Sequence, residues 1–171
     1  IVLAGDSAGA SLALALAIRL RDRGDALPAA LALISPVTQL PPPAGYPNIA
    51  IDPMVRADWV RTGVAWYACP VDDAAHHPLR TDLRGLPPML VQAGEQEILL
   101  ADATRLAFHA RACGVACRFE LHRARWHVFH LQAFYLRSAA NAIGALAHFA
   151  REHVALPASA PVPEAQAAGS H

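Results

Sequence analysis

The stretch Gly5-Asp6-Ser7-Ala8-Gly9 fits the pattern G-x-S-x-G and decides how the chain is interpreted. It follows the apolar run 1–4 and precedes the segment 10–23, which predicts a helix that is apolar nearly all round until Ile18. Between a strand and a helix, this pattern places a serine nucleophile on a sharp, strained turn. Glycines two residues to either side would let neighbouring backbone and helix approach without a Cβ clash. The alternative interpretation is a chance glycine-rich turn that carries a solvated serine.

Beyond this turn, apolar runs alternate with helix-like segments. Three runs predict further strands, at 29–34, 89–93 and 115–121. Helices are predicted between them, at 58–69 and 99–113. A long C-terminal helix is then predicted, with an inner face made of Leu131, Phe134, Tyr135, Ser138, Ala142, Leu146 and Phe149. Strand and helix in alternation predict the α/β class, a parallel sheet with helices on its faces.

Composition excludes several classes of protein. Of the 171 residues, 54% are hydrophobic and 16% are charged, which excludes a largely disordered chain. The 14 basic residues, all arginine, balance 14 acidic ones, so no basic face for nucleic acid is implied. The longest uncharged stretch, 26–51, is too rich in proline to form one membrane-spanning helix. Three cysteines, Cys69, Cys113 and Cys117, are expected to be free thiols in the cytoplasm.

We expect one domain over 1–154 and a disordered tail, rich in alanine and proline, over 155–171. The sequence opens with Ile1 inside an apolar run rather than with methionine. We therefore expect the true N-terminus to lie upstream of this chain.

A serine nucleophile needs a base, and the base needs an orienting carboxylate. In this kind of sheet the chain order is serine, acid, histidine, and the groups gather at the carboxyl ends of strands. The acid should follow the third strand, where three carboxylates compete: Glu95, Glu97 and Asp102. The base should follow the fourth strand, where three imidazoles compete: His122, His127 and His130. Position and chemistry alone leave both choices open.

Four motifs, in order and at fitting intervals, give the chain a family resemblance. They are the G-x-S-x-G stretch, 82–88 (DLRGLPP), 94–102 (GEQEILLAD) and 126–130 (WHVFH). With them, residues 1–152 resemble the C-terminal half of a hormone-sensitive-lipase-like esterase of the α/β hydrolase fold-3 family. The resemblance implies an α/β-hydrolase-type sheet that lacks its N-terminal strands and cap. It also implies a serine carboxylic-ester hydrolase acting on small, short-chain ester substrates without metal or organic cofactor.

The resemblance also chooses among the competing residues. It implies Ser7 as nucleophile, Glu97 as acid and His127 as base, while the Ala8 N–H is a candidate oxyanion donor at a helix N-terminus. Asp102 is then expected to be a first-turn helix residue favoured by the helix dipole. The remaining histidines are expected to lie at the surface or in loops, and no metal site is expected from them: His76, His77, His122 and His130.

The chain departs from the family in two ways. An upstream His-Gly-Gly sequence, whose backbone N–H groups complete the oxyanion hole in the family, is missing. Before His127 the family usually has glycine and an apolar residue, where Ala124 and Arg125 stand here. We expect Arg125 to face water. Residues 40–53 and 55–67 are expected to contribute one wall of the substrate pocket.

Two other classes of function compete with the enzyme. One is a non-catalytic ligand-binding module, since receptors of this kind resemble the esterases but typically lack the histidine, which His127 supplies here. The other is an inactive remnant, which would lack an oxyanion donor and expose the run 1–4 as an unpaired strand edge.

Overall fold

The computed structural model describes residues 1–39, 52–68, 70 and 73–154. Within them, one parallel sheet has the order β1-β2-β3-β4, made of β1 (Val2–Asp6), β2 (Ala30–Ile34), β3 (Met89–Gly94) and β4 (Cys117–His122). The helices are α1 (Ala8–Arg23), α2 (Ala57–Tyr67), α3 (Leu100–Ala112) and α4 (Arg137–His153), with single-turn 3₁₀ helices η1 (Ala74–His76) and η2 (Phe129–Gln132). The predicted α/β class with a parallel sheet is confirmed.

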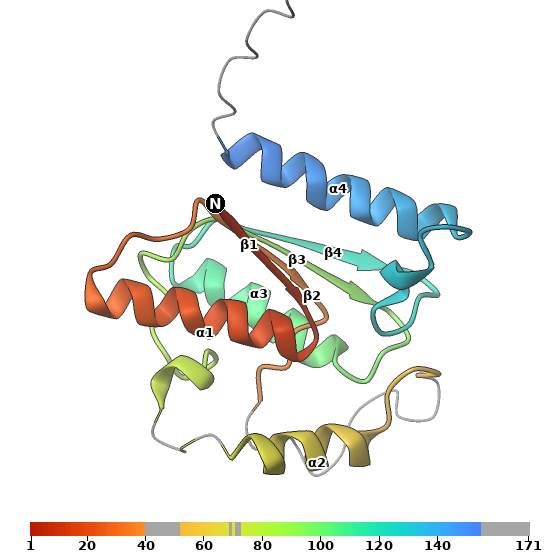
Figure 1. Cartoon of the computed structure of the whole chain (residues 1–171), viewed down its shortest axis with the longest axis horizontal. Helices are drawn as coiled ribbons and strands as arrows, with labels where there is room; N and C mark the ends of the chain where they lie inside the picture. Colours follow the sequence, from red (N-terminus) through yellow and green to blue (C-terminus); the bar gives the residue numbers. More distant parts are fainter. Residues whose placement is uncertain (40–51, 69, 71–72, 155–171) are drawn as a thin grey trace, which may run out of the picture.

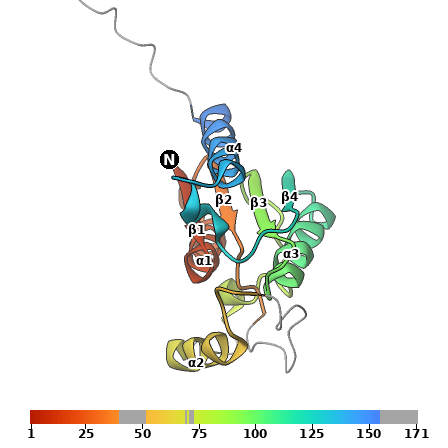
Figure 2. The same cartoon turned by 90° about the vertical axis from the view of Figure 1, so that its right-hand side faces the viewer.

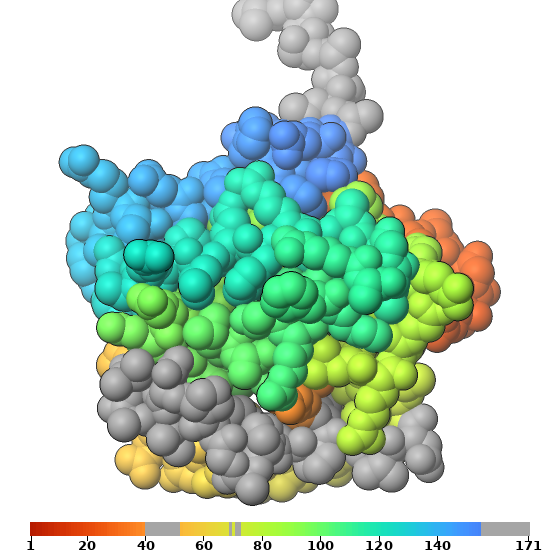
Figure 3. All heavy atoms as spheres, turned by 180° about the vertical axis from the view of Figure 1, so that it is seen from behind, coloured from red at the N-terminus to blue at the C-terminus, as the bar shows by residue number. Residues whose placement is uncertain are grey.

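Helices cover both faces of the sheet. α1 and α3 lie together on one face and α4 lies on the other, while α2 lies beyond α1 on the outer side (Figures 1 and 2). The main core fills the space between the sheet and the α1–α3 layer, where Leu14, Ile18, Leu31 and Leu106 are fully buried. Seen from behind, α3 and β4 form a closed surface with α4 above them (Figure 3). The central strands β2 and β3 are therefore buried almost throughout, whereas the edge strands β1 and β4 are only partly buried.

The predicted C-terminal helix is wrong in its first half. Leu131, Phe134 and Tyr135 are exposed, and the helix begins only at Arg137. The cause is a break in the backbone, because Val128 adopts a left-handed conformation (φ 48°) before η2, and Leu136 is extended. A spacing of three and four residues continues across this break in the sequence, although the helix does not. From Ala142 onward the predicted inner face is partly or fully buried, and its members Leu146 and Phe149 pack on the sheet.

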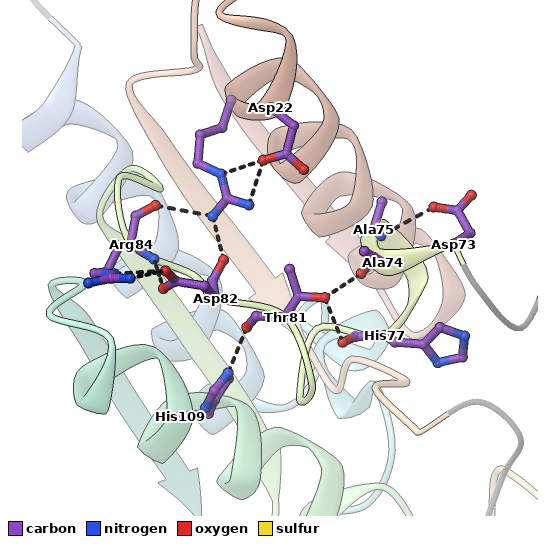
Figure 4. A network of polar contacts seen from close by, with 10 residues as sticks. Asp22, Asp73, Ala74, Ala75, His77, Thr81, Asp82, Arg84 and His109 are labelled. Atoms are coloured by element: carbon purple, nitrogen blue, oxygen red, sulfur yellow. Dashed lines mark hydrogen bonds and ion pairs between the residues drawn. The ribbon is translucent and has the colours of Figure 1, made fainter.

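A network of polar contacts fastens the connection between α2 and β3 to the helices below the sheet (Figure 4). The Arg21 guanidinium donates to the Asp82 carbonyl oxygen at 2.5 Å, and His109 Nε2 donates to the Thr81 carbonyl oxygen at 2.8 Å. The Thr81 hydroxyl donates to the His77 carbonyl oxygen at 3.1 Å. Residues of α1 and α3 therefore hold this connection, and η1 with it, in one place.

Two expectations, on the C-terminal tail and on the cysteines, concern residues that lie partly or wholly outside the described ranges. The predicted tail over 155–171 lies beyond Val154, the last described residue. Cys113 and Cys117 are free thiols, as expected, whereas Cys69 lies outside the described residues.

The turn between β1 and α1 shows why its first glycine is required. Ser7 has φ 51° and ψ −120°, a conformation that costs a non-glycine residue about 1–3 kcal/mol. This turn brings α1 so close to β1 that a Cβ on Gly5 would lie 2.4 Å from the carbonyl oxygen of Gly9. A Cβ on Gly9 would meet nothing within 4 Å, because that residue lies on the outer side of the helix. The close-approach role predicted for both glycines therefore belongs to Gly5.

The two glycines give a matched test of this turn. We expect Gly5→Ala to lower the free energy of unfolding by about 2 kcal/mol or more, since the new methyl group meets backbone that cannot move aside. We expect Gly9→Ala to be neutral or stabilising by up to about 1 kcal/mol, because alanine is the better helix former. Urea unfolding followed by circular dichroism measures both, and equal losses in the two variants would contradict the geometry.

Candidate active site

The polar groups singled out in the sequence gather at one edge of the sheet. The last residues of β1 and β2 pair, Asp6 with Ile34, and β3 and β4 end two residues further on, where Gly94 pairs with His122, because Ile34 pairs with Gln92. Ser7 follows β1 directly, and Glu97 and His127 lie in the loops that follow β3 and β4. These loops lie at the same edge of the sheet, where all the strand arrows end (Figure 1). This is the edge at which open parallel sheets bind their ligands.

Glu97 and His127 form a buried pair at this edge. The Glu97 side chain is fully buried, and its Oε2 atom lies 3.7 Å from His127 Nδ1, whose ring is also buried. The Ser35 hydroxyl, at the end of β2, donates to the same Oε2 atom at 2.7 Å. A separation of 3.7 Å is an ion-pair distance rather than a hydrogen bond, and catalytic hydrogen bonds are often this long before substrate binds. The carboxylate is thus placed to orient the imidazole through Nδ1.

Close backbone packing positions the loop that carries His127. A Cβ on Gly94 would lie 2.4 Å from the Arg125 carbonyl oxygen, so only glycine allows this approach. The same oxygen accepts a hydrogen bond from the Gln96 N–H at 2.8 Å. The expectation that the Arg125 side chain faces water is wrong, because its Nε donates to the Ser138 hydroxyl on α4 at 2.7 Å. Arg125 therefore ties the loop to α4.

The other two carboxylates have structural partners. Asp102 lies in the first turn of α3, as expected, and is fully buried. It accepts hydrogen bonds from the N–H groups of Thr38 and Gln39 at 2.8 and 3.1 Å, and so holds the loop after β2. Glu95 accepts a hydrogen bond from the Ala124 N–H at 2.9 Å.

The expectation for His122 and His130 as surface or loop residues is wrong. His122 is the last residue of β4 and half-buried, and His130 lies buried in η2. Burial, which penalises the imidazolium, lowers the pKa of His130 to about 4, and the nearby His122 and His127 add to the effect. Burial also lowers the pKa of His122. His130 contacts Gln92 of β3, a fully buried polar residue for which the sequence pattern gave no signal.

Ser7 and Ala8 lie where the helix dipole is positive. Ser7 is half-buried, its N–H donates to the Ile34 carbonyl oxygen at 2.8 Å, and Ala8 is the first residue of α1. Backbone N–H groups in the first turn of a helix have no carbonyl partner within the helix. An oxyanion beside Ser7 would therefore meet favourable potential from α1.

A cavity of about 360 Å³ opens beside Ser7 between α1 and α2. Val55, Trp59, Val60 and Val64 form much of its lining, so the segment 55–67, predicted as one wall of the substrate pocket, lines this cavity. The wall predicted at 40–53 lies almost entirely outside the described residues. A volume of this size lies at the lower end of the range for small-molecule pockets. The lining suits a small apolar group.

His76 also lines this cavity and belongs to η1, which corrects the expectation of a loop histidine. It ends η1, and its Nε2 lies 3.3 Å from the Tyr67 hydroxyl and 3.4 Å from the Arg19 guanidinium. Burial lowers the pKa of His76, although Asp73 opposes the effect. His77 beside it is buried as well. No local sequence motif indicates a role for either residue, because His76 reaches the cavity beside Ser7 only through the fold of the connection between α2 and β3.

Two searches over the described residues bear on other functions. Within the ranges that the structure covers, no three His, Cys, Asp or Glu side chains are grouped as metal ligands would be. In the same ranges, every helix is too short or too polar to cross a membrane.

Comparison with known proteins places the chain among esterases. A family model described as alpha/beta hydrolase fold matches residues 1–131. An esterase of Acinetobacter venetianus is 34% identical over 88% of this chain and 51% of its own length. The carboxylesterase/phospholipase LipF of Mycobacterium tuberculosis is 36% identical over 95% of this chain and 46% of its own length. A crystal structure of an esterase from the bacterial hormone-sensitive lipase family has TM-score 0.84 and 35% identity, over 91% of this chain and 54% of that one.

The chain thus spans about half the length of these relatives. The match to the family model, over residues 1–131, includes all four strands and the helices α1, α2 and α3.

The buried histidines predict a pH dependence of stability. In the unfolded chain His130 takes up a proton near its ordinary pKa of 6.5, whereas in the folded chain it stays neutral down to about pH 4. The unfolded state therefore binds more protons in this window, and the free energy of unfolding falls as pH drops from about 6.5 to about 4. We expect this decrease in the free energy of unfolding to be smaller in His130→Phe, by up to about 3 kcal/mol.

Urea unfolding at pH 7 and pH 4.5 measures the difference for each variant. His148→Phe is the matched control, because the His148 side chain is 65% exposed on α4. A pH-dependent fall as large in His130→Phe as in the unchanged chain would show that His130 does not carry it.

Proposed function

The chain belongs to the α/β hydrolase family, and we propose that it carries the catalytic groups of a serine hydrolase acting on carboxylic esters. Ser7 is the nucleophile, His127 the general base and Glu97 the carboxylate that orients it. The observation that carries the proposal is the buried Glu97–His127 pair, 3.7 Å apart, at the same sheet edge as the strained turn of Ser7.

The chemistry follows the roles of the three groups. Ser7 Oγ attacks the ester carbonyl carbon while His127 Nε2 takes the hydroxyl proton, so that the imidazole becomes positively charged next to Glu97. The tetrahedral oxyanion then collapses, His127 gives the proton to the leaving alcohol, and the acyl group stays on Ser7. Water activated by His127 attacks this acyl-serine and releases the acid. The Ala8 N–H supplies one oxyanion donor.

The cavity beside Ser7 supports short apolar acyl groups as substrates. Its volume of about 360 Å³ leaves room for a small group, and α2 supplies an apolar wall. Because the chain spans about half of its relatives, we infer that the second oxyanion donor and the remaining pocket wall come from outside these residues. Loss of one oxyanion donor typically costs about 10²–10³ in rate, so the chain alone should react slowly with esters.

A fluorophosphonate probe tests the triad, because phosphonylation needs an activated serine but no turnover. We expect mass spectrometry to find the label on Ser7 and no label in Ser7→Ala. Ser11→Ala is the matched control, since Ser11 lines the same cavity but its hydroxyl donates to the Val37 carbonyl oxygen. His127→Gln should slow labelling by about 10²–10⁴-fold, the usual contribution of general-base catalysis.

Label retained in Ser7→Ala would contradict the proposed nucleophile. Absence of labelling in a folded chain would instead favour the non-catalytic alternative, a ligand-binding module or an inactive remnant.

The size of the cavity gives a second test. Gly63 lines it, and a Cβ there would meet nothing within 4 Å, so Gly63→Leu should fill the space without disturbing α2. In Gly63→Leu we expect labelling by a hexylphosphonate probe to fall at least about tenfold relative to labelling by a methylphosphonate probe. The contacts of a few methylene groups with an apolar pocket change the rate by at least this factor. Thr62→Leu places the same leucine side chain at a neighbouring exposed position of α2 that does not line the cavity, and should leave the ratio unchanged. Equal ratios in both variants would show that the alkyl group lies elsewhere.

A further inference from the structure

A buried amide in the middle of β3 connects the sheet to the loop of His127. Gln92 is fully buried and lies on the face of the sheet that α4 covers, two residues after Leu90, which packs against Phe149. Its Nε2 donates to Glu120 Oε2 on β4 at 2.6 Å and to the Ala142 carbonyl oxygen on α4 at 3.2 Å. A buried amide of this kind destabilises a sheet unless all its polar atoms are paired.

These two acceptors fix the orientation of the amide. Because a carboxylate and a carbonyl oxygen both face the Gln92 nitrogen, the Gln92 Oε1 atom must point the other way, and it lies 2.9 Å from His130 Nε2. An amide oxygen only accepts hydrogen bonds, so His130 Nε2 must carry a proton. His130 Nδ1 is buried and has no hydrogen-bond partner among the described residues. The ring is therefore the neutral tautomer with its proton on Nε2.

The bond joins the two segments that supply the proposed acid and base. Gln92 lies five residues before Glu97, and His130 lies three residues after His127, on the far side of the turn at Val128. Glu120, the third member of the network, pairs with Gln92 in the sheet register and makes an ion pair with Arg118. His122, at the end of β4, stacks against Phe129 with ring centroids 5.0 Å apart. The loop of His127 is thus fastened to β3, β4 and α4 through side chains.

We propose that Gln92 and His130 are positioning residues, which set the separation of Glu97 and His127 through the hydrogen bond from His130 Nε2 to Gln92 Oε1. The proposal rests on the proposed function for the roles of Glu97 and His127. Neither residue touches the reacting atoms. The bond acts on the reaction through the place of the His127 ring, and misplacement of a catalytic group by about 1 Å can cost a factor of about 10² in rate.

A pair of variants at His130 separates the hydrogen bond from the packing of the ring. His130→Phe keeps a ring of similar size but has no donor, whereas His130→Gln carries an amide N–H that reaches about as far as the imidazole Nε2–H. We expect the phosphonylation rate of Ser7 to fall at least about tenfold in His130→Phe and to return to within about threefold of the unchanged chain in His130→Gln. A His130→Phe rate equal to that of the unchanged chain, or no rescue by His130→Gln, would overturn the proposal.

Magnetic resonance supplies readouts that do not depend on reactivity. Long-range proton–nitrogen correlations of the unchanged chain should show His130 with its proton on Nε2, and a proton on Nδ1 would overturn the proposal even if His130→Phe did not fold. The ring shifts of His127 should move in His130→Phe and return in His130→Gln, and unmoved shifts in a folded His130→Phe would overturn it too. If the unchanged chain takes no label, the proposed function fails, and these shifts alone decide whether the bond positions His127.

Discussion

The in-register pairing of four parallel strands is the constraint on which the rest of the structure depends. Asp6 pairs with Ile34, Ile34 with Gln92 and Gly94 with His122, so all four strands end at one edge, β3 and β4 two residues beyond β1 and β2. A shift of register by one residue would turn every side chain of a strand to the other face. It would move Gln92 from the α4 face and carry the Ser35 hydroxyl away from Glu97. The site is therefore a consequence of the pairing rather than of any one loop.

Three buried hydrogen bonds then fix the loops that leave this edge. Ser35 binds Glu97, Asp102 binds the N–H of Thr38, and His130 binds Gln92. Each bond joins segments that are far apart in the sequence, and each has a partner that is fully or almost fully buried. A buried polar group that loses its partner costs about 1–3 kcal/mol. Moving any of these loops would break one of the bonds and incur this cost, so the loops stay in place. Such preorganisation would serve the proposed acyl transfer, since a catalytic group that is already in place requires no reorganisation during the reaction.

Sequence reasoning found what local patterns encode and missed what only the fold brings together. The apolar runs and the G-x-S-x-G stretch predicted the strands, α1, α3 and the turn at Ser7, because burial and turn geometry impose residue types at short range. The same reasoning placed Leu131 to Tyr135 on a buried helix face, since helical spacing continues in the sequence after the backbone has turned at Val128. It also assigned His130 to the surface or a loop, because nothing near it in the sequence shows that Gln92, 38 residues away, accepts a hydrogen bond from it.

The proposed catalytic residues and the wall of the cavity lie on parts of the chain that differ in rigidity. Ser7, Glu97 and His127 stand on loops tied to a buried sheet, whereas α2 contributes only Ala57 to the buried residues and leaves Trp59 and Trp66 largely exposed. Few buried apolar contacts mean a low cost of local opening, so α2 can move or change its sequence without disturbing the strands. If the proposed triad acts on esters, substitutions on the inner face of α2 should alter which acyl group fits and leave the reaction itself in place. Selectivity and catalysis would then depend on separate sets of contacts, so that one arrangement of catalytic groups could accept substrates of different size.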